Sequence, residues 1–229
     1  AGHSQVNYRL RVRRDTELDE DYKDQVDRTT SSIPVNQSLY DMTADKEFPK
    51  MIVFGLDHTL WPFKVHVNYV SPFNKIQDEI RDSHGKLVSY YPEVPEILSF
   101  LKKHSSNVKI GIASLSKDRT GANQLLDLLG WGQYIDYREI FESKHKEKKS
   151  HFLNLHKHSG IDYEDMLFFD DQWKNNIEPA YLNVTCWWVI NGLNKIKLNK
   201  GLVNWNECHK ILQNPKFEIS DFKKAENLI

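Results

Sequence analysis

The chain has 229 residues, 39% of them apolar, so it is long enough to bury one sizeable core. Its 31 lysines and arginines are balanced by 32 aspartates and glutamates, and this near-neutral charge argues against nucleic acid or an anionic membrane surface as a partner. The longest uncharged apolar run, residues 184–190, is too short to cross a bilayer, so we expect a soluble protein without membrane insertion.

The two cysteines, Cys186 and Cys208, are too far apart in the sequence to form the close pair that a zinc site uses. Such sparse cysteine usage predicts an intracellular reducing compartment, either the cytoplasm or the mitochondrial matrix. The sequence begins at Ala1 rather than methionine, which a cloning boundary, methionine excision or cleavage of an organelle presequence would each explain.

Residues 1–47 are polar and carry dense charge of both signs between Arg11 and Arg28. They contain no apolar period that would start a core, so we interpret them as an extension of a main domain at residues 48–215, with a short tail at 216–229. We expect a protein partner to hold this extension, which makes it a candidate tether. Packing of the extension on its own domain is the alternative.

From Met51 onward, short apolar runs alternate with amphipathic stretches, which is typical of a parallel sheet with helices on both faces. This pattern predicts a three-layer α/β/α fold. The predicted strands cover residues 51–54, 108–113, 137–141, 166–169 and 184–190. The predicted helices cover residues 92–104 and 118–129, a segment that ends at Gly160, a segment around Ile177 to Tyr181, and residues 205–212.

Between the first predicted strand and the first predicted helix, residues 75–91 contain two semi-alternating runs on either side of His84 and Gly85. Two such runs around a turn dipeptide indicate a small β-hairpin. We expect this hairpin to act as a flap over a site.

In open α/β sheets, ligands bind at the carboxyl ends of the strands, so we expect site residues directly after each apolar run. Residues 54–63 read Phe-Gly-Leu-Asp-His-Thr-Leu-Trp-Pro-Phe. This segment resembles the first motif of the haloacid dehalogenase (HAD) superfamily, in which Asp-x-Asp-x-Thr follows the first strand. The trailing Trp-Pro-Phe narrows the resemblance to the eukaryotic magnesium-dependent phosphatases.

Further motifs of this family follow in the same order and extend the resemblance over residues 51–212. Several agreeing motifs are far more specific than any one of them. They are Tyr-Pro-Glu-Val-Pro-Glu at 91–96, Ala-Ser at 113–114, Gly-Ala-Asn-Gln-Leu-Leu at 121–126, Arg-Glu-Ile at 138–140, Ser-His-Phe at 150–152 and Phe-Phe-Asp-Asp at 168–171.

The resemblance implies hydrolysis of phosphate monoesters through an aspartyl-phosphate. In the family, the first aspartate of Asp-x-Asp attacks phosphorus and binds magnesium, while the second acts as acid and base and offers its backbone carbonyl to the metal. A hydroxyl after the second strand and a lysine after the third hold the phosphoryl group. Acidic residues after the fourth strand hold the metal.

Transferred by position, the acid/base is Asp57, whose backbone carbonyl would also bind the metal. The phosphate-binding residues are Ser114 and Lys148, and the metal carboxylates are Asp170 and Asp171. Lys144 or Lys149 could replace Lys148, because the segment is a few residues longer than usual. The alternative for the three aspartates is capping of the helices that follow them.

The family pattern breaks at the nucleophile, where the chain has Gly55. Glycine has no side chain to form the aspartyl-phosphate, and its presence also removes one anionic ligand, so a magnesium ion would bind only weakly. Leu115 stands where the family has an arginine, and His58 replaces a tyrosine. Several changed positions favour natural loss of activity over an engineered replacement.

One histidine lies within the lysine-rich residues 144–149 and three follow them, at positions 145, 151, 156 and 158. No two of them have the i, i+4 spacing of a helical metal site, so we expect solvated surface rather than zinc. The lysine-rich stretch is too short and too mixed to indicate nucleic acid.

These observations predict a catalytically impaired phosphatase-like protein that serves as a structural or interaction subunit of a larger protein assembly. The first alternative is a magnesium-dependent phosphatase acting on phosphotyrosine or sugar phosphates on proteins, with its nucleophile mutated. A further alternative is a module that binds a phosphorylated ligand through Ser114, Lys148 and helix amino termini without cleaving it.

Overall fold

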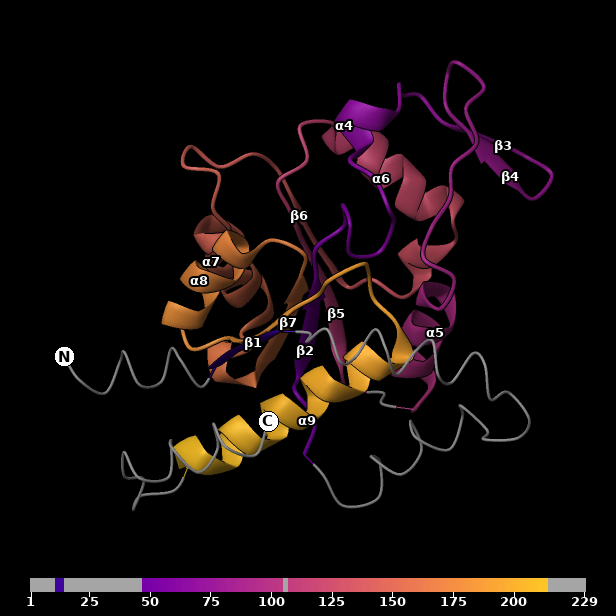
Figure 1. Cartoon of the computed structure of the whole chain (residues 1–229). Helices are drawn as coiled ribbons and strands as arrows, with labels where there is room; N and C mark the ends of the chain where they lie inside the picture. The colour runs from indigo at the N-terminus through magenta and orange to yellow at the C-terminus, as the bar shows by residue number, and fades with distance from the viewer. Residues whose placement is uncertain (1–10, 15–46, 105–106, 214–229) are drawn as a thin grey trace.

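A six-stranded parallel sheet with helices on both faces forms the body of the protein (Figure 1). The computed structural model describes residues 11–14, 47–104 and 107–213. The sheet strands are β1 (Val12–Arg14), β2 (Met51–Phe54), β5 (Lys109–Ser114), β6 (Tyr137–Ile140), β7 (Met166–Asp170) and β8 (Thr185–Trp188). The helices are α4 (Val65–Asn68), α5 (Val94–His104), α6 (Arg119–Leu128), α7 (Lys149–Ser159), α8 (Trp173–Tyr181) and α9 (Lys195–Gln213), with 3₁₀ turns η1 (Trp131–Gln133) and η2 (Tyr163–Asp165).

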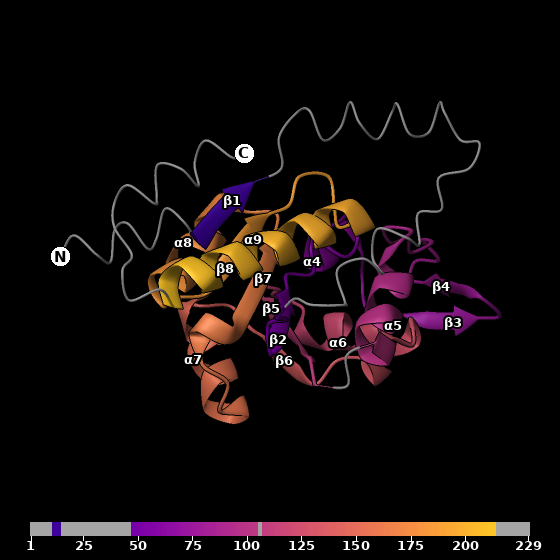
Figure 2. The same cartoon turned by 90° about the horizontal axis from the view of Figure 1, so that it is seen from below.

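The strand order is β1-β8-β7-β2-β5-β6, which places β2 at the centre between β7 and β5. Because successive strand side chains point to opposite faces, β2 sends Ile52 and Phe54 to one core and Met51 and Val53 to the other. The first core packs under α5, α6 and α9, and the second under α7 and α8. Figure 2 shows α7 on one side of β2 and α5 and α6 on the other. The predicted α/β/α fold is therefore confirmed.

The predicted reversal at His84 and Gly85 is present, since Arg81 and Leu87 form an antiparallel bridge across it, and an additional hairpin precedes it. Strands β3 (Asn74–Ile76) and β4 (Glu79–Arg81) pair antiparallel, so the turn falls between Ile76 and Glu79. His84 and Gly85 form a second tight turn, in which Asp82 Oδ1 accepts hydrogen bonds from the backbone N–H groups of His84 and Lys86 at 3.0 and 2.8 Å. The hairpin projects from the body of the domain (Figure 1).

Part of the predicted N-terminal extension belongs to the sheet. Val12–Arg14 form β1, which pairs parallel with β8, and Val12 and Arg11 are buried. Arg11 Nη1 donates a hydrogen bond to Thr185 Oγ1 at 3.2 Å, and burial lowers the pKa of its guanidinium. This short piece therefore packs on its own domain, as the alternative interpretation has it. The rest of the extension, residues 1–10 and 15–46, and the predicted tail at 216–229 lie outside the described residues.

The helix predicted around Ile177 to Tyr181 is present as α8, whose buried face consists of Asn175, Asn176, Pro179 and Ala180, while Tyr181 is exposed. The start of the last helix needs correction. Helix α9 begins at Lys195, ten residues before the predicted start at position 205, since Lys195, Lys197 and Asn204 are buried along its first half and mask its apolar period.

Tryptophans and cysteines complete the core. Trp187 is buried, whereas Trp188 is partly buried and lies against Trp173 with ring centroids 5.4 Å apart. Cys186 and Cys208 are both buried, and they form no disulfide with each other. Within the described ranges, no helix combines the length and apolar character needed to span a membrane.

Candidate functional site

A cleft of about 250 Å³ opens at the carboxyl ends of the central strands. Residues that follow β2, β5 and β7 reach it, together with residues from the loop before α7 and from the start of α8. The predicted site residues Asp57, Ser114, Lys148, Asp170 and Asp171 all line this cleft. Parallel strands bring these positions together from separate parts of the sequence.

The floor of the cleft is built around Gly55. Its backbone N–H donates a hydrogen bond to Phe169 O at 2.9 Å, which continues the pairing of β2 with β7. A β-carbon at position 55 would lie 2.5 Å from Asp170 Oδ2 and 3.3 Å from Lys148 Nζ. The carboxylate of Asp170 therefore occupies the space into which a side chain at position 55 would extend.

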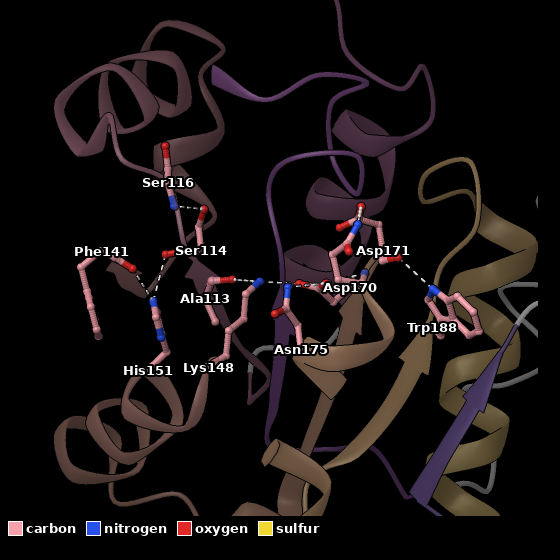
Figure 3. Close-up of polar contacts among 11 residues, drawn as sticks. Ala113, Ser114, Ser116, Phe141, Lys148, His151, Asp170, Asp171, Asn175 and Trp188 are labelled. Carbon is pink, nitrogen blue, oxygen red and sulfur yellow. Dashed lines mark hydrogen bonds and ion pairs between the residues drawn. The ribbon is translucent and has the colours of Figure 1, made fainter. Parts of the chain in front are cut away.

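Asp170 is fully engaged by protein groups (Figure 3). Its Oδ2 forms a buried ion pair with Lys148 Nζ, and its Oδ1 accepts hydrogen bonds from Gln172 N at 2.8 Å and Asn175 Nδ2 at 3.1 Å. Lys148 Nζ also donates to Ala113 O at 2.7 Å. Both side chains are almost inaccessible to solvent, with exposed fractions of 4% for Lys148 and 1% for Asp170. Burial leaves this pair little water to screen its attraction.

The other two carboxylates of the cleft are harder to ionise than usual. Burial, with the neighbouring charge of Asp170, raises the pKa of Asp171 to about 6, and its Oδ2 accepts from Gln172 Nε2 at 2.9 Å. Burial also raises the pKa of Asp57, although Asp57 Oδ1 accepts a hydrogen bond from Trp61 Nε1 at 2.9 Å. Asp57 further accepts from the backbone of Val65, the first residue of α4, so it also supports the start of a helix.

A buried histidine supports the wall of the cleft. Nε2 of His151 lies 2.9 Å from both Ser114 O and Phe141 O, so this nitrogen carries the proton and donates to the two carbonyls. The ring stacks on Phe141 with centroids 3.9 Å apart. Burial, with the neighbouring charge of Lys148, lowers the pKa of His151 to about 4. His151 therefore ties the end of β5 to the end of β6 (Figure 3).

The placement of His151 corrects the prediction that all four histidines lie on solvated surface. His151 is fully buried, because the apolar face of α7 turns it toward Phe141 rather than toward water. Its position in the Ser-His-Phe motif was the signal that could have found it. No group of three histidine, cysteine or acidic side chains is arranged to hold a metal ion in the part of the chain that the structure describes.

Residues that the sequence did not predict also line the cleft, and three of them are lysines. Lys64, Lys146 and Lys174 surround its mouth, and all three are exposed. They belong to no motif, so only the fold brings them together. Of the alternatives for the motif lysine, Lys144 and Lys149 are exposed and do not line the cleft, whereas Lys148 does.

The domain that carries the cleft is similar in sequence to known proteins. Residues 47–208 match the family described as Acid Phosphatase. Human Magnesium-dependent phosphatase 1 is 42% identical over 155 residues, which cover 67% of this chain and 85% of the relative. A HAD-like hydrolase superfamily protein of Schizosaccharomyces pombe is 32% identical over 167 residues, which cover 69% of this chain and 92% of the relative.

Solved structures agree in fold. An uncharacterized protein of Listeria monocytogenes superposes with a TM-score of 0.51 over 69% of this chain and 98% of its own, at 15% identity. A protein of Mesorhizobium loti assigned as a HAD-like phosphatase superposes with a TM-score of 0.50 over 72% of this chain and 88% of its own, at 10% identity. At these identities the similarity concerns the arrangement of the sheet and its helices.

Proposed function

The chain belongs to the Acid Phosphatase family and has a HAD-like fold, and on this premise we propose that it is a catalytically inactive member that serves as a structural or interaction subunit of a larger protein assembly. The observation that carries the proposal is the floor of the cleft. Gly55 offers no oxygen there, and the carboxylate of Asp170 lies where a side chain at position 55 would extend.

The chemistry of phosphate monoesters explains why this floor matters. An anionic ester reacts only when a nucleophile is held in line with phosphorus and the charge on the phosphoryl oxygens is neutralised. Asp170 cannot simply take over the attack, because Lys148, Gln172 and Asn175 hold both of its oxygens. Lys148, the predicted phosphate ligand, would have to exchange its contacts with Asp170 and Ala113 for the phosphoryl group.

We further propose that magnesium binding is weakened. The ion prefers an octahedral shell of oxygen ligands, and family members use it in a charged pocket. The residues present fit it poorly: Gly55 supplies no carboxylate, both oxygens of Asp170 already have partners, and the raised pKa of Asp171 reflects an environment that disfavours its charged form. Asp171 and the backbone carbonyl of Asp57 would be the remaining ligands.

An active phosphatase is the competing hypothesis. It is favoured by the convergence of Asp57, Ser114, Lys148, Asp170 and Asp171 on one cleft and by the identity to a magnesium-dependent phosphatase. Phosphotyrosine or sugar phosphates on proteins would be its substrates. This hypothesis requires a nucleophile other than residue 55.

A turnover assay separates the two hypotheses. The full chain and the Asp57→Asn variant are incubated with p-nitrophenyl phosphate and magnesium at several pH values. We expect the two proteins to release product at the same rate as buffer. Release by the wild-type chain that Asp57→Asn abolishes would establish an active phosphatase and overturn the proposal.

The role of the extension as a tether stays a prediction, as does a reducing compartment in the cytoplasm or mitochondrial matrix. Since Val12–Arg14 pair with β8, deletion of residues 1–47 would also uncover that strand. Replacing the charged residues between positions 15 and 46 by serine leaves β1 in place. If complexes isolated with a tagged chain keep their size after this change, the charges of the extension are not the tether.

A further inference from the structure

Three lysines at the mouth of the cleft have ammonium groups without a partner in the described part of the chain. Lys64 precedes α4, Lys146 lies in the loop between β6 and α7, and Lys174 lies in the first turn of α8. All three side chains are exposed, and within the described ranges their ammonium groups form no ion pair or hydrogen bond. We call these residues the cationic rim.

The sign of the charged side chains changes from the mouth of the cleft to its interior. Among its lining residues, the exposed charged side chains are lysines, whereas Asp57 and Asp171 are partly buried and Asp170 is buried. Lys148, at the floor, is already neutralised by Asp170. An approaching anion therefore meets the cationic rim before it meets any carboxylate.

Exposed apolar side chains accompany the rim. Val67 on α4 is 64% exposed, and Trp173 at the start of α8 is 38% exposed directly before Lys174. Val67 is largely exposed and Trp173 is partly exposed beside the ring of Trp188, so both offer apolar surface next to the cationic rim. The rim contains lysine and no arginine, and lysine contacts anions as a mobile point charge rather than through a fixed planar fork.

We propose that the mouth of the cleft is a docking surface for an acidic segment of a partner protein. Carboxylates of the segment would bind Lys64, Lys146 and Lys174, and an apolar side chain of the segment would pack on Val67 or Trp173. A protein segment fits better than nucleic acid, because the chain as a whole carries a formal net charge of −1 and the rim is confined to one small cleft. The inference rests on the proposed role as an interaction subunit and names the chemistry of the partner.

Fluorescence anisotropy with the full chain tests the proposal. The probe is a labelled peptide of alternating glutamate and leucine, and a peptide with lysine in place of glutamate is its control. We expect saturable binding of the acidic probe that weakens as salt rises. Replacing the three rim lysines by glutamate, in a Lys64→Glu/Lys146→Glu/Lys174→Glu variant, should weaken binding of the acidic probe about tenfold or more.

The matched control is Lys157→Glu, an exposed lysine on α7 that does not line the cleft. It should leave the affinity unchanged. No binding of the acidic probe at millimolar concentration, or binding that the rim variant does not weaken, would overturn the proposal. Tighter, rim-dependent binding of a labelled single-stranded RNA would also overturn it, in favour of a nucleic-acid partner.

A phosphatase assay on the same preparations separates this inference from the proposed function. Turnover of a phosphorylated peptide would refute catalytic inactivity while leaving rim-dependent docking of the glutamate probe intact. Absence of both turnover and docking would refute the docking surface alone.

Discussion

The charged side chains at the floor of the cleft and those at its rim differ in burial and in pairing. At the floor, Lys148 and Asp170 are buried and paired beside Gly55. At the rim, Lys64, Lys146 and Lys174 are exposed, and their ammonium groups have no partner among the described residues. Buried charges depend on each other, because removing one leaves the other without water or partner. Exposed charges are nearly independent of the fold. A site can therefore lose its chemistry at the floor and keep a surface for recognition at the rim.

The largest expected effect concerns the floor ion pair. Lys148→Met should lower the free energy of unfolding by about 3 to 5 kcal/mol, since the buried side chain of Asp170 would lose its cationic partner. Urea denaturation measures this change. The double variant Lys148→Met/Asp170→Asn removes both charges and should recover part of the loss. A loss below about 1 kcal/mol for Lys148→Met is typical of a solvent-exposed ion pair and would contradict the burial of Lys148 and Asp170.

The next effect is a pH dependence at the wall behind the floor. His151 has a pKa of about 4 in the fold against 6.5 when free, so the unfolded chain binds the proton more readily. Its contribution to stability is complete above pH 6.5 and is lost as the pH falls toward 4, by about 3 kcal/mol. Urea titrations of the wild type and His151→Gln should therefore converge in this window. Parallel pH profiles would contradict the buried neutral imidazole.

A smaller effect tests the space beside Gly55. Gly55→Ala should destabilise the protein by about 1 to 3 kcal/mol, because the new β-carbon would displace the Asp170 carboxylate 2.5 Å away. The same substitution in an Asp170→Ala background meets no carboxylate and should cost much less. If Gly55→Ala lowers the free energy of unfolding equally in both backgrounds, the double-mutant cycle would show no coupling between positions 55 and 170 and would contradict the contact.

The rim should give the smallest effect on stability. Each of Lys64→Glu, Lys146→Glu and Lys174→Glu is expected to change the free energy of unfolding by no more than about 0.5 kcal/mol, since these side chains have no partner in the described part of the chain. Thermal denaturation measures this. A loss above about 1 kcal/mol for any of them would mean that the rim is part of the structure rather than a free surface.

The two regions also differ in how far the sequence predicted them. Gly55, Asp57, Ser114 and Asp170 could be found because each stands at or just after the end of a strand and matches a family motif, and parallel strands deliver such positions to one edge. Lys148 was one of three lysines that the resemblance left open. The rim lysines match no motif and come from segments whose relative positions depend on the whole fold. The ion pair in the space beside Gly55 likewise depends on side-chain packing that no spacing rule contains.

The helices and strands differ in the same way, because some are encoded by their own sequence and others depend on distant residues. The central strands and helices α5, α6 and α7 were predicted because their apolar periods are strong. Strand β1 was missed because three residues in a charged segment carry no period, and only pairing with β8 makes them a strand. The turn at Gly85 was predicted, whereas the turn between β3 and β4 was missed because Gln77, which adopts a positive φ of 56°, is a weaker turn signal than glycine.

The most direct test of the proposed loss of catalysis at the floor is a search for the covalent intermediate. The full chain is incubated with acetyl phosphate and magnesium, quenched in acid and analysed by intact-protein mass spectrometry with and without hydroxylamine. We predict an unmodified mass under both conditions, because residue 55 has no carboxylate and Asp170 is held by its three partners. A phosphoryl adduct that hydroxylamine removes would show that a carboxylate of this chain still attacks phosphorus and would contradict the account.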